Sequence, residues 1–223
     1  VLKKQGQAWA YTTKFFDSNN PFQLFTVFKI LKKEERPVLT EFQLLKTSDY
    51  ILALKFLLTY PFHVIKLVRK LGDKPEDGLL AHAIFDTLGG PALLYYFQLL
   101  YGRRISLIPV KRIKCISWYE NQPREKCFYK GLRSMKGKVE VYGAQLFVWP
   151  SNLGSIDPDE SEIEFGVVPD KIVVNGQFYL PEKTLIDYRV GPSLRSGRLF
   201  QVQANPAKSE NILILMPYFE PEI

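Results

Sequence analysis

Two apolar runs that each end in polar residues constrain what this chain can fold into. The first covers 111–118, ends at Trp118 and is followed by Tyr119-Glu120. The second covers 138–142 and is followed by Gly143-Ala144-Gln145. A helical pattern over 121–135 separates them. Strand, helix and strand in this order indicate a βαβ unit with parallel strands, since the helix carries the chain back to the starting edge. The sequence therefore predicts an α/β protein.

Three more segments continue this pattern towards the C-terminus. Residues 171–174 follow the turn signal Pro169-Asp170, and residues 187–190 precede the turn residues Gly191-Pro192, so we expect both segments to be strands of the same sheet. The acidic stretch 151–168 is predicted to be a long loop. Residues 211–216 are strongly apolar and precede Pro217, which is typical of the first strand of another α/β domain. We therefore expect 206–223 to be a linker and the first strand of a second domain that this sequence does not include.

Residues 1–110 have a helical character instead. Pro21 suits the first position of a helix, and apolar residues at helical spacing follow it. A further helix is expected from about Ser48, bent or ended at Pro61. The predicted organisation is thus a basic helical region over 1–110, a parallel-sheet domain over 111–205 and the linker with its strand.

The charge of the chain is concentrated in that helical region. Residues 1–110 hold 15 Lys and Arg against 9 Asp and Glu, a net +6, whereas residues 111–223 hold 15 against 14, a net +1. A basic excess favours an anionic partner such as phosphate, nucleic acid or an acidic membrane surface. Nucleic acid is disfavoured because the aromatic residues do not interleave with a basic stripe. No run reaches about 18 uninterrupted apolar residues.

The polar tip of the first strand is the leading candidate site. In an open α/β sheet, ligands bind outside the carboxyl ends of the strands. Glu120 at that end could accept a proton from an attacking hydroxyl, and Trp118 and Tyr119 could stack on a sugar, with Asn121 and Gln122 beside them. The alternative is structural: a carboxylate that stabilises a helix N-terminus and aromatic residues that belong to the core.

Two further residues complete the predicted site. Arg124 lies in the first helical turn and could bind a phosphate or carboxylate. Gln145 follows the second strand and suits hydroxyl-rich ligands, although an ordinary strand-to-loop turn explains it equally well. Glycine-rich phosphate loops and metal-ligand spacing of the two histidines are missing from the sequence, so no metal or cofactor is expected.

Residues 111–218 resemble the bacterial surface-carbohydrate glycosyltransferases, such as those of lipopolysaccharide and capsule, that have two Rossmann-like domains (the GT-B architecture). Three motifs carry the resemblance, followed by an apparent interdomain crossing at 190–217: Trp118-Tyr-Glu-Asn-Gln122, Tyr142-Gly-Ala-Gln145 and Gly166-Val-Val-Pro-Asp-Lys-Ile-Val-Val-Asn-Gly176. Related enzymes often have Gln-His-Gly where this chain has Gln145-Leu146-Phe147, which weakens the transfer of a catalytic role to Gln145.

The resemblance implies a Rossmann-like parallel sheet and the transfer of a sugar from a nucleotide-sugar donor to a glycan or lipid-linked glycan acceptor. In this architecture the second domain holds most of the nucleotide, so this chain would supply the acceptor side and the base Glu120. The implied location is cytoplasmic, with peripheral attachment of the basic helices to the anionic inner membrane. The alternative function is a non-enzymatic α/β module of polysaccharide assembly that binds a membrane or a partner protein.

Overall fold

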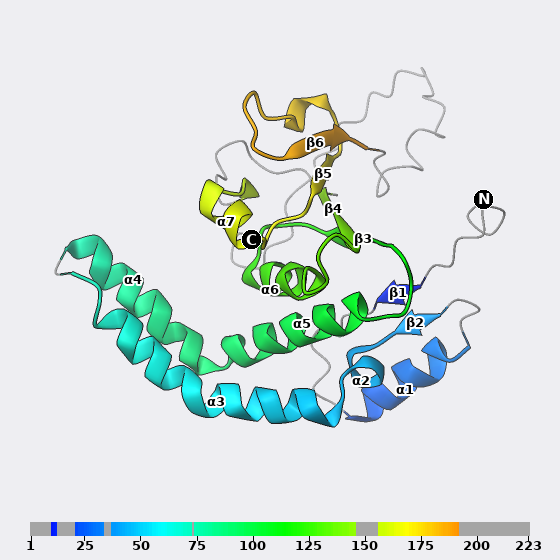
Figure 1. Ribbon diagram of the computed structural model, residues 1–223, viewed down its shortest axis with the longest axis horizontal. Coiled ribbons are helices and arrows are strands. Elements are labelled where there is room, and N and C mark those ends of the chain that lie inside the picture. The colour runs from blue at the N-terminus through cyan, green and yellow to red at the C-terminus, as the bar shows by residue number, and fades with distance from the viewer. Residues whose placement is uncertain (1–9, 13–20, 34–36, 73, 146–155, 192–223) are drawn as a thin grey trace, which may run out of the picture.

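The computed structural model describes residues 10–12, 21–33, 37–72, 74–145 and 156–191, and it is a mixed α/β structure (Figure 1). Among the described residues, five α-helices precede the main sheet: α1 (Pro21–Leu31), α2 (Glu41–Leu44), α3 (Thr47–Val68), α4 (Pro75–Asp86) and α5 (Pro91–Ser106). Two two-residue strands, β1 (Tyr11–Thr12) and β2 (Val38–Leu39), pair in parallel among them. The predicted helical region is therefore present, and the short strands were not expected from the sequence.

The main sheet has four strands, all parallel. They are β3 (Ile113–Trp118), β4 (Val139–Gln145), β5 (Lys171–Val174) and β6 (Asp187–Val190), and they lie side by side in that order. Helix α6 (Pro123–Leu132) connects β3 to β4, and α7 (Glu160–Phe165) lies between β4 and β5. The predicted α/β class with a Rossmann-like parallel sheet is confirmed.

Strand order explains why one face of the sheet is covered. Parallel crossovers are right-handed, so connections that always step in the same direction place their helices on the same face. The core follows this rule: alternate strand residues such as Val141, Ile172 and Val174 are buried with Phe128 and Leu132 of α6. Among the described strands the order never reverses, so this part of the sheet has no switch point of the kind that often marks a ligand crevice.

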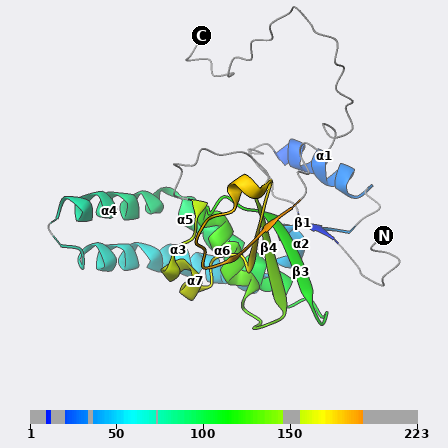
Figure 2. The ribbon, with the colours of Figure 1, turned by 90° about the horizontal axis from the view of Figure 1, so that it is seen from above.

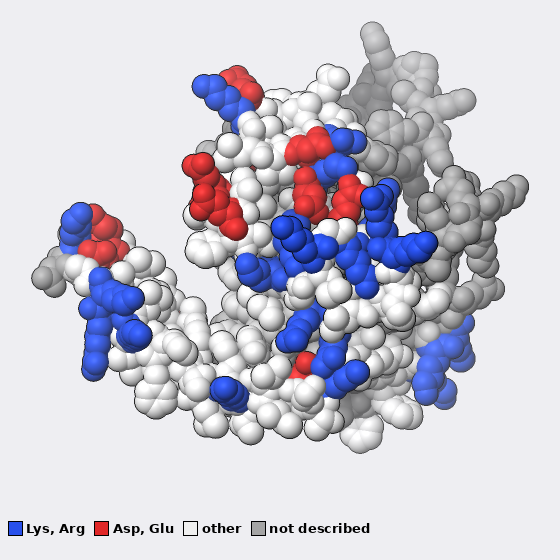
Figure 3. Space-filling model, in the orientation of Figure 1, with Lys and Arg blue, Asp and Glu red and all other residues white. Residues whose placement is uncertain are grey.

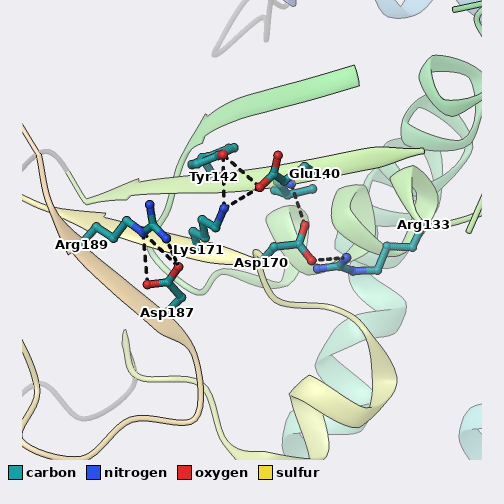
Figure 4. A network of polar contacts seen from close by, with 8 residues as sticks. Arg133, Glu140, Tyr142, Asp170, Lys171, Asp187 and Arg189 are labelled. Carbon is teal, nitrogen blue, oxygen red and sulfur yellow. Dashed lines mark hydrogen bonds and ion pairs between the residues drawn. The ribbon is translucent and has the colours of Figure 1, made fainter. Parts of the chain in front are cut away.

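The other face of the sheet carries polar side chains (Figure 4). Glu140 accepts hydrogen bonds from the Lys171 ammonium at 2.6 Å and from the Tyr142 hydroxyl at 2.9 Å. The hydrogen bond from Lys171 is the main cause that lowers the pKa of Glu140. Arg189 pairs with Asp187 on β6. These cross-strand contacts suit a solvated face and explain the polar side chains at positions 140 and 142 of β4 and 171 of β5.

Helix α5 packs against α6 with very close backbones. A methyl group placed on Gly131 of α6 would lie 2.1 Å from the Leu99 carbonyl oxygen of α5. A methyl group on Gly102 of α5 would lie 2.3 Å from the Phe128 carbonyl oxygen of α6. Only glycine fits at either position, and this crossing fixes the sheet domain to the last helix of the N-terminal region.

Helices α3 and α4 form an antiparallel hairpin that projects from the rest of the molecule (Figures 1 and 2). The expectation that Pro61 bends or ends its helix is wrong in its stronger form, because α3 continues through Pro61 to Val68. Packing of the turn before the proline supports the helix: the rings of Phe56 and Tyr96 stack at 4.3 Å, and the hydroxyls of Tyr60 and Thr87 lie 2.7 Å apart.

Part of the acidic stretch differs from its prediction as well. Residues 160–165 form helix α7, whose first turn is capped by Asp159 through a 2.9 Å hydrogen bond from the Glu162 backbone amide. Residues 160–165 form a helix and not the predicted loop, because this N-terminal cap and the acidic residues of the first turn stabilise the helix. The linker and strand expected over 206–223 lie outside the described residues.

Candidate functional site

The candidate site is the carboxyl end of β3 and β4. Trp118 and Ala144 are register partners at that end, and the Tyr119 amide donates a 3.1 Å hydrogen bond to the Ala144 carbonyl. This bond extends the ladder one residue beyond β3 and places the chain from 118 to 122 beside Gln145, the last residue of β4. The parallel arrangement therefore brings the polar residues at the carboxyl ends of both predicted strands to the same side of the sheet.

Alternation along the strand divides the predicted residues between the two faces. Trp118 is exposed on the uncovered face, and Glu120, two residues later, lies on the same side. The Trp118 indole nitrogen donates a 2.6 Å hydrogen bond to a Glu120 carboxylate oxygen. An indole and a half-buried carboxylate thus stand together at the sheet edge in a fixed mutual orientation.

Tyr119 points the opposite way, into the core. Its side chain is fully buried, and its hydroxyl lies 3.4 Å from the Ile156 carbonyl. Burial is the largest cause that raises its pKa above the usual value, because the phenolate would lose its hydration. The expectation that Tyr119 stacks on a sugar is corrected by this placement, and the structural alternative of a core aromatic applies to it.

The turn between β3 and α6 is held by two glutamates that the sequence analysis did not single out. Asn121 adopts φ 58°, a left-handed conformation that asparagine tolerates better than most residues. Buried Glu125 of α6 accepts a 2.9 Å hydrogen bond from the Glu120 amide. Glu162 of α7 accepts a 3.2 Å hydrogen bond from the Asn121 side chain and pairs with Lys126. These contacts position Glu120 without using its own carboxylate.

The remaining predicted residues lie around this turn. Gln122 is the exposed N-cap of α6, and its amide lies 3.4 Å from Glu125. Arg124 is half-buried in the first turn of α6. Gln145 is 3% exposed, and among the described residues its Nε2 atom has no hydrogen-bond partner. Gln145 pairs with the core residue Val174 in the register of β4 and β5, so its side chain points to the covered face with Tyr119 and away from Trp118 and Glu120.

Glu125 could have been recognised from the sequence, whereas Glu162 could not. Gln122 and Glu125 have the three-residue spacing of an N-cap and its reciprocal acidic partner, which the sequence displays. Glu162 is 42 residues after Glu120, and only the tertiary fold brings α7 beside the start of α6. Within the described ranges, no three His, Cys, Asp or Glu side chains gather closely enough to hold a metal ion.

No protein-family model, curated protein or solved structure matches the chain. The fold class and the geometry of the sheet edge therefore come from the structure, and the function has to be argued from the site itself. One helix among the described residues, α3, is long and apolar enough to cross a membrane by length and composition, which is weak evidence when a single helix passes.

Proposed function

We propose that this chain is the acceptor-side half of a glycosyltransferase that transfers a sugar from a nucleotide-sugar donor to a growing bacterial surface polysaccharide. The observation that carries the proposal is the pair of Trp118 and Glu120 at the carboxyl end of β3, joined by a 2.6 Å hydrogen bond. An aromatic plane beside a carboxylate is what a sugar hydroxyl needs for recognition and activation.

The pair supplies two functions. The exposed Trp118 ring offers an apolar plane on which a pyranose ring could stack, and its N–H orients the Glu120 carboxylate. Glu120 then serves as the general base: it takes the proton of the acceptor hydroxyl as that oxygen bonds to the anomeric carbon of the donor. The bond from the anomeric carbon to the nucleotide phosphate breaks as the new bond forms, and the nucleoside phosphate leaves with that electron pair.

The surroundings fit an acceptor with several hydroxyl groups. Asn121, Gln122 and Arg124 lie on the turn and helix that follow Glu120, whereas Gln145 at the adjacent strand end is buried on the covered face and would reach an acceptor only after local opening. The donor nucleotide would be bound mainly by a second domain, in the arrangement implied by the GT-B resemblance. On this proposal the described residues would contribute the acceptor side, and the site would be completed by that second domain.

The test is sugar transfer by the full-length protein with Glu120→Gln. This substitution keeps the size of the side chain and an oxygen that can accept the Trp118 hydrogen bond, but it removes the base. We expect kcat to fall by about 100-fold or more with little change in acceptor KM. The matched control is Glu140→Gln, a carboxylate of the same sheet that lies on β4 in the ladder of Figure 4.

Two results would contradict this proposal. If Glu120→Gln turns over as fast as the unaltered protein, Glu120 is not the base. If the unaltered protein binds acceptor glycan and no nucleotide sugar supports transfer, the alternative of a non-enzymatic assembly module is favoured. Circular dichroism of each variant shows whether its fold is retained, so that a loss of rate is assigned to chemistry.

A further inference from the structure

The outer side of the α3–α4 hairpin carries an unusual apolar surface. Five large side chains of α3 are between 40% and 73% exposed and recur every three or four residues: Ile51, Leu54, Leu58, Phe62 and Ile65. Such spacing aligns them on one stripe of the helix. Leu79 of α4 adds a side chain that is 76% exposed. A stripe this long on a free surface marks an interaction site.

The opposite side of α3 is already occupied by protein. Asp49, Ala53 and Val64 are buried there. The Asp49 carboxylate receives hydrogen bonds from the Arg104 guanidinium of α5 at 2.6 and 2.9 Å. Polar and aromatic contacts therefore hold one side of helix α3 to α5, and the apolar stripe on its other side faces outwards. This is the reverse of an ordinary surface helix, whose apolar side faces the protein. This attachment favours a helix that lies along a surface over one that crosses a membrane.

The charges that α3 and the residues just after it carry beside the stripe have one sign, whereas α4 of the hairpin carries the acidic residues Glu76, Asp77 and Asp86. Between Tyr50 and Gly72 the chain has four basic residues and no Asp or Glu: Lys55, Lys66, Arg69 and Lys70. Three of them stand at the end of the stripe, where Phe62, Ile65, Lys66, Arg69 and Lys70 line a shallow hollow. Figure 3 shows basic side chains towards the free end of the hairpin, next to a largely uncharged surface, with acidic side chains beside them at the tip, where α4 begins with Glu76 and Asp77.

We infer that the outer side of the α3–α4 hairpin docks on an anionic lipid surface, with the α3 stripe buried among acyl chains and Lys66, Arg69 and Lys70 among the headgroups. Apolar burial and attraction to anionic headgroups reinforce each other in interfacial helices of this kind. Basic side chains beside a lipid-facing stripe extend their charged ends towards the headgroups while their stems stay apolar. A purely apolar protein partner would leave these cations without counter-charges.

The experiment is co-sedimentation of the 223-residue chain with vesicles of phosphatidylcholine alone or with added phosphatidylglycerol, without donor or acceptor sugar. Its outcome is therefore independent of the transfer proposal. We expect binding to the anionic vesicles that weakens with salt. The double variant Leu58→Gln/Phe62→Gln should lose about tenfold in partitioning for each side chain, because both become unable to bury apolar surface in lipid.

Two further variants complete the design. Lys66→Gln/Arg69→Gln/Lys70→Gln should lose about fivefold per cation on anionic vesicles and change little on neutral ones. The matched control Phe165→Gln/Phe178→Gln removes two aromatic side chains that are 66% and 81% exposed outside the hairpin, and it should bind as the unaltered chain does.

Three results would overturn the inference. The first is no binding to anionic vesicles at low salt. The second is equal binding by the Leu58→Gln/Phe62→Gln variant and the control variant. The third is a dimer, detected by light scattering, that becomes a monomer when Leu58 and Phe62 are replaced while no form of the chain binds vesicles. That result would assign the stripe to a second copy of the chain.

Discussion

The close crossing of α5 and α6 makes a quantitative prediction about stability. In Gly131→Ala the new methyl group would lie 2.1 Å from the Leu99 carbonyl oxygen and 2.8 Å from the Arg103 amide nitrogen. Both are backbone atoms, which cannot rotate away. The helices must separate by about 1 Å before the carbon and oxygen atoms reach van der Waals contact. Such a separation disturbs the buried side chains of Tyr101, Phe128 and Leu132.

The expected loss follows from two opposing terms. Overpacking a tight interior site costs about 1–3 kcal/mol or more. Alanine regains about 1 kcal/mol because it is a better helix former than glycine. The overpacking cost at Gly131 should be about 3 kcal/mol, because the obstructing atoms belong to the backbone. After the gain in helix propensity, we expect a net loss of about 2 kcal/mol in the free energy of unfolding. Gly78 of α4 is the matched control: it has no atom within 4 Å of its added methyl group. Gly78→Ala should stabilise the protein by up to about 1 kcal/mol.

Urea unfolding followed by circular dichroism at 222 nm, a standard helix signal, measures both variants against the unaltered chain. The two substitutions should have opposite signs. If Gly131→Ala is as stable as Gly78→Ala, the helices do not approach as closely as described, and the account of how the sheet domain is attached to α5 is refuted.

Two predictions concern pH. Burial raises the pKa of Asp49, but the hydrogen bonds from Arg104 and from a backbone amide outweigh it, so the folded pKa is below the ordinary value. The ion pair thus contributes stability above about pH 4 that is lost as the pH falls through the folded pKa, and Asp49→Asn should cost about 1–3 kcal/mol at pH 7 and progressively less at lower pH. Burial raises the pKa of Tyr101, Tyr119 and Tyr129. The unfolded chain releases these protons first, so the unfolding free energy should fall as the pH rises above about 10.

Urea titrations at several pH values check both statements. A loss in Asp49→Asn that stays the same at pH 3 and pH 7 would show that the ion pair is not its source. Tyrosine absorbance that titrates fully near pH 10 while the circular dichroism stays native would show that the three phenols are accessible to solvent.

The sequence predicted the sheet well where strands are short and bounded by turn residues. The bounds of β5 and β6 match their predictions, because Pro169-Asp170 marks the start of β5 and Gly191-Pro192 marks the end of β6. Strand β4 is longer than predicted, since Gly143 to Gln145 continue the ladder with β5. The paired strands β1 and β2 escaped detection because two residues each carry no periodic signal and their pairing spans a long stretch of chain.

The sequence predicted where the candidate site lies along the chain, but it did not predict to which face of the sheet each side chain points. Each face of β3 has apolar side chains, Ile113 and Cys115 on one and Ile116 and Trp118 on the other, so alternation alone does not say which face is covered. The answer depends on strand order, which the sequence does not reveal. Once α6 and α7 are known to lie on one face, the outward position of Trp118 and the burial of Tyr119 follow.

Acceptor binding at the edge of β3 tests the central claim most directly. The chain has three tryptophans, so its proton–nitrogen correlation spectrum should contain three indole N–H signals, and loss of one in Trp118→Phe would assign the Trp118 signal. Titration of the labelled chain with a series of surface-polysaccharide oligosaccharides should shift this resonance saturably, and Glu120→Gln should retain the shift because it removes the base and not the stacking plane. A Trp118 resonance that stays unmoved by every oligosaccharide, including ones that bind elsewhere on the chain, would contradict the assignment of this edge to the acceptor.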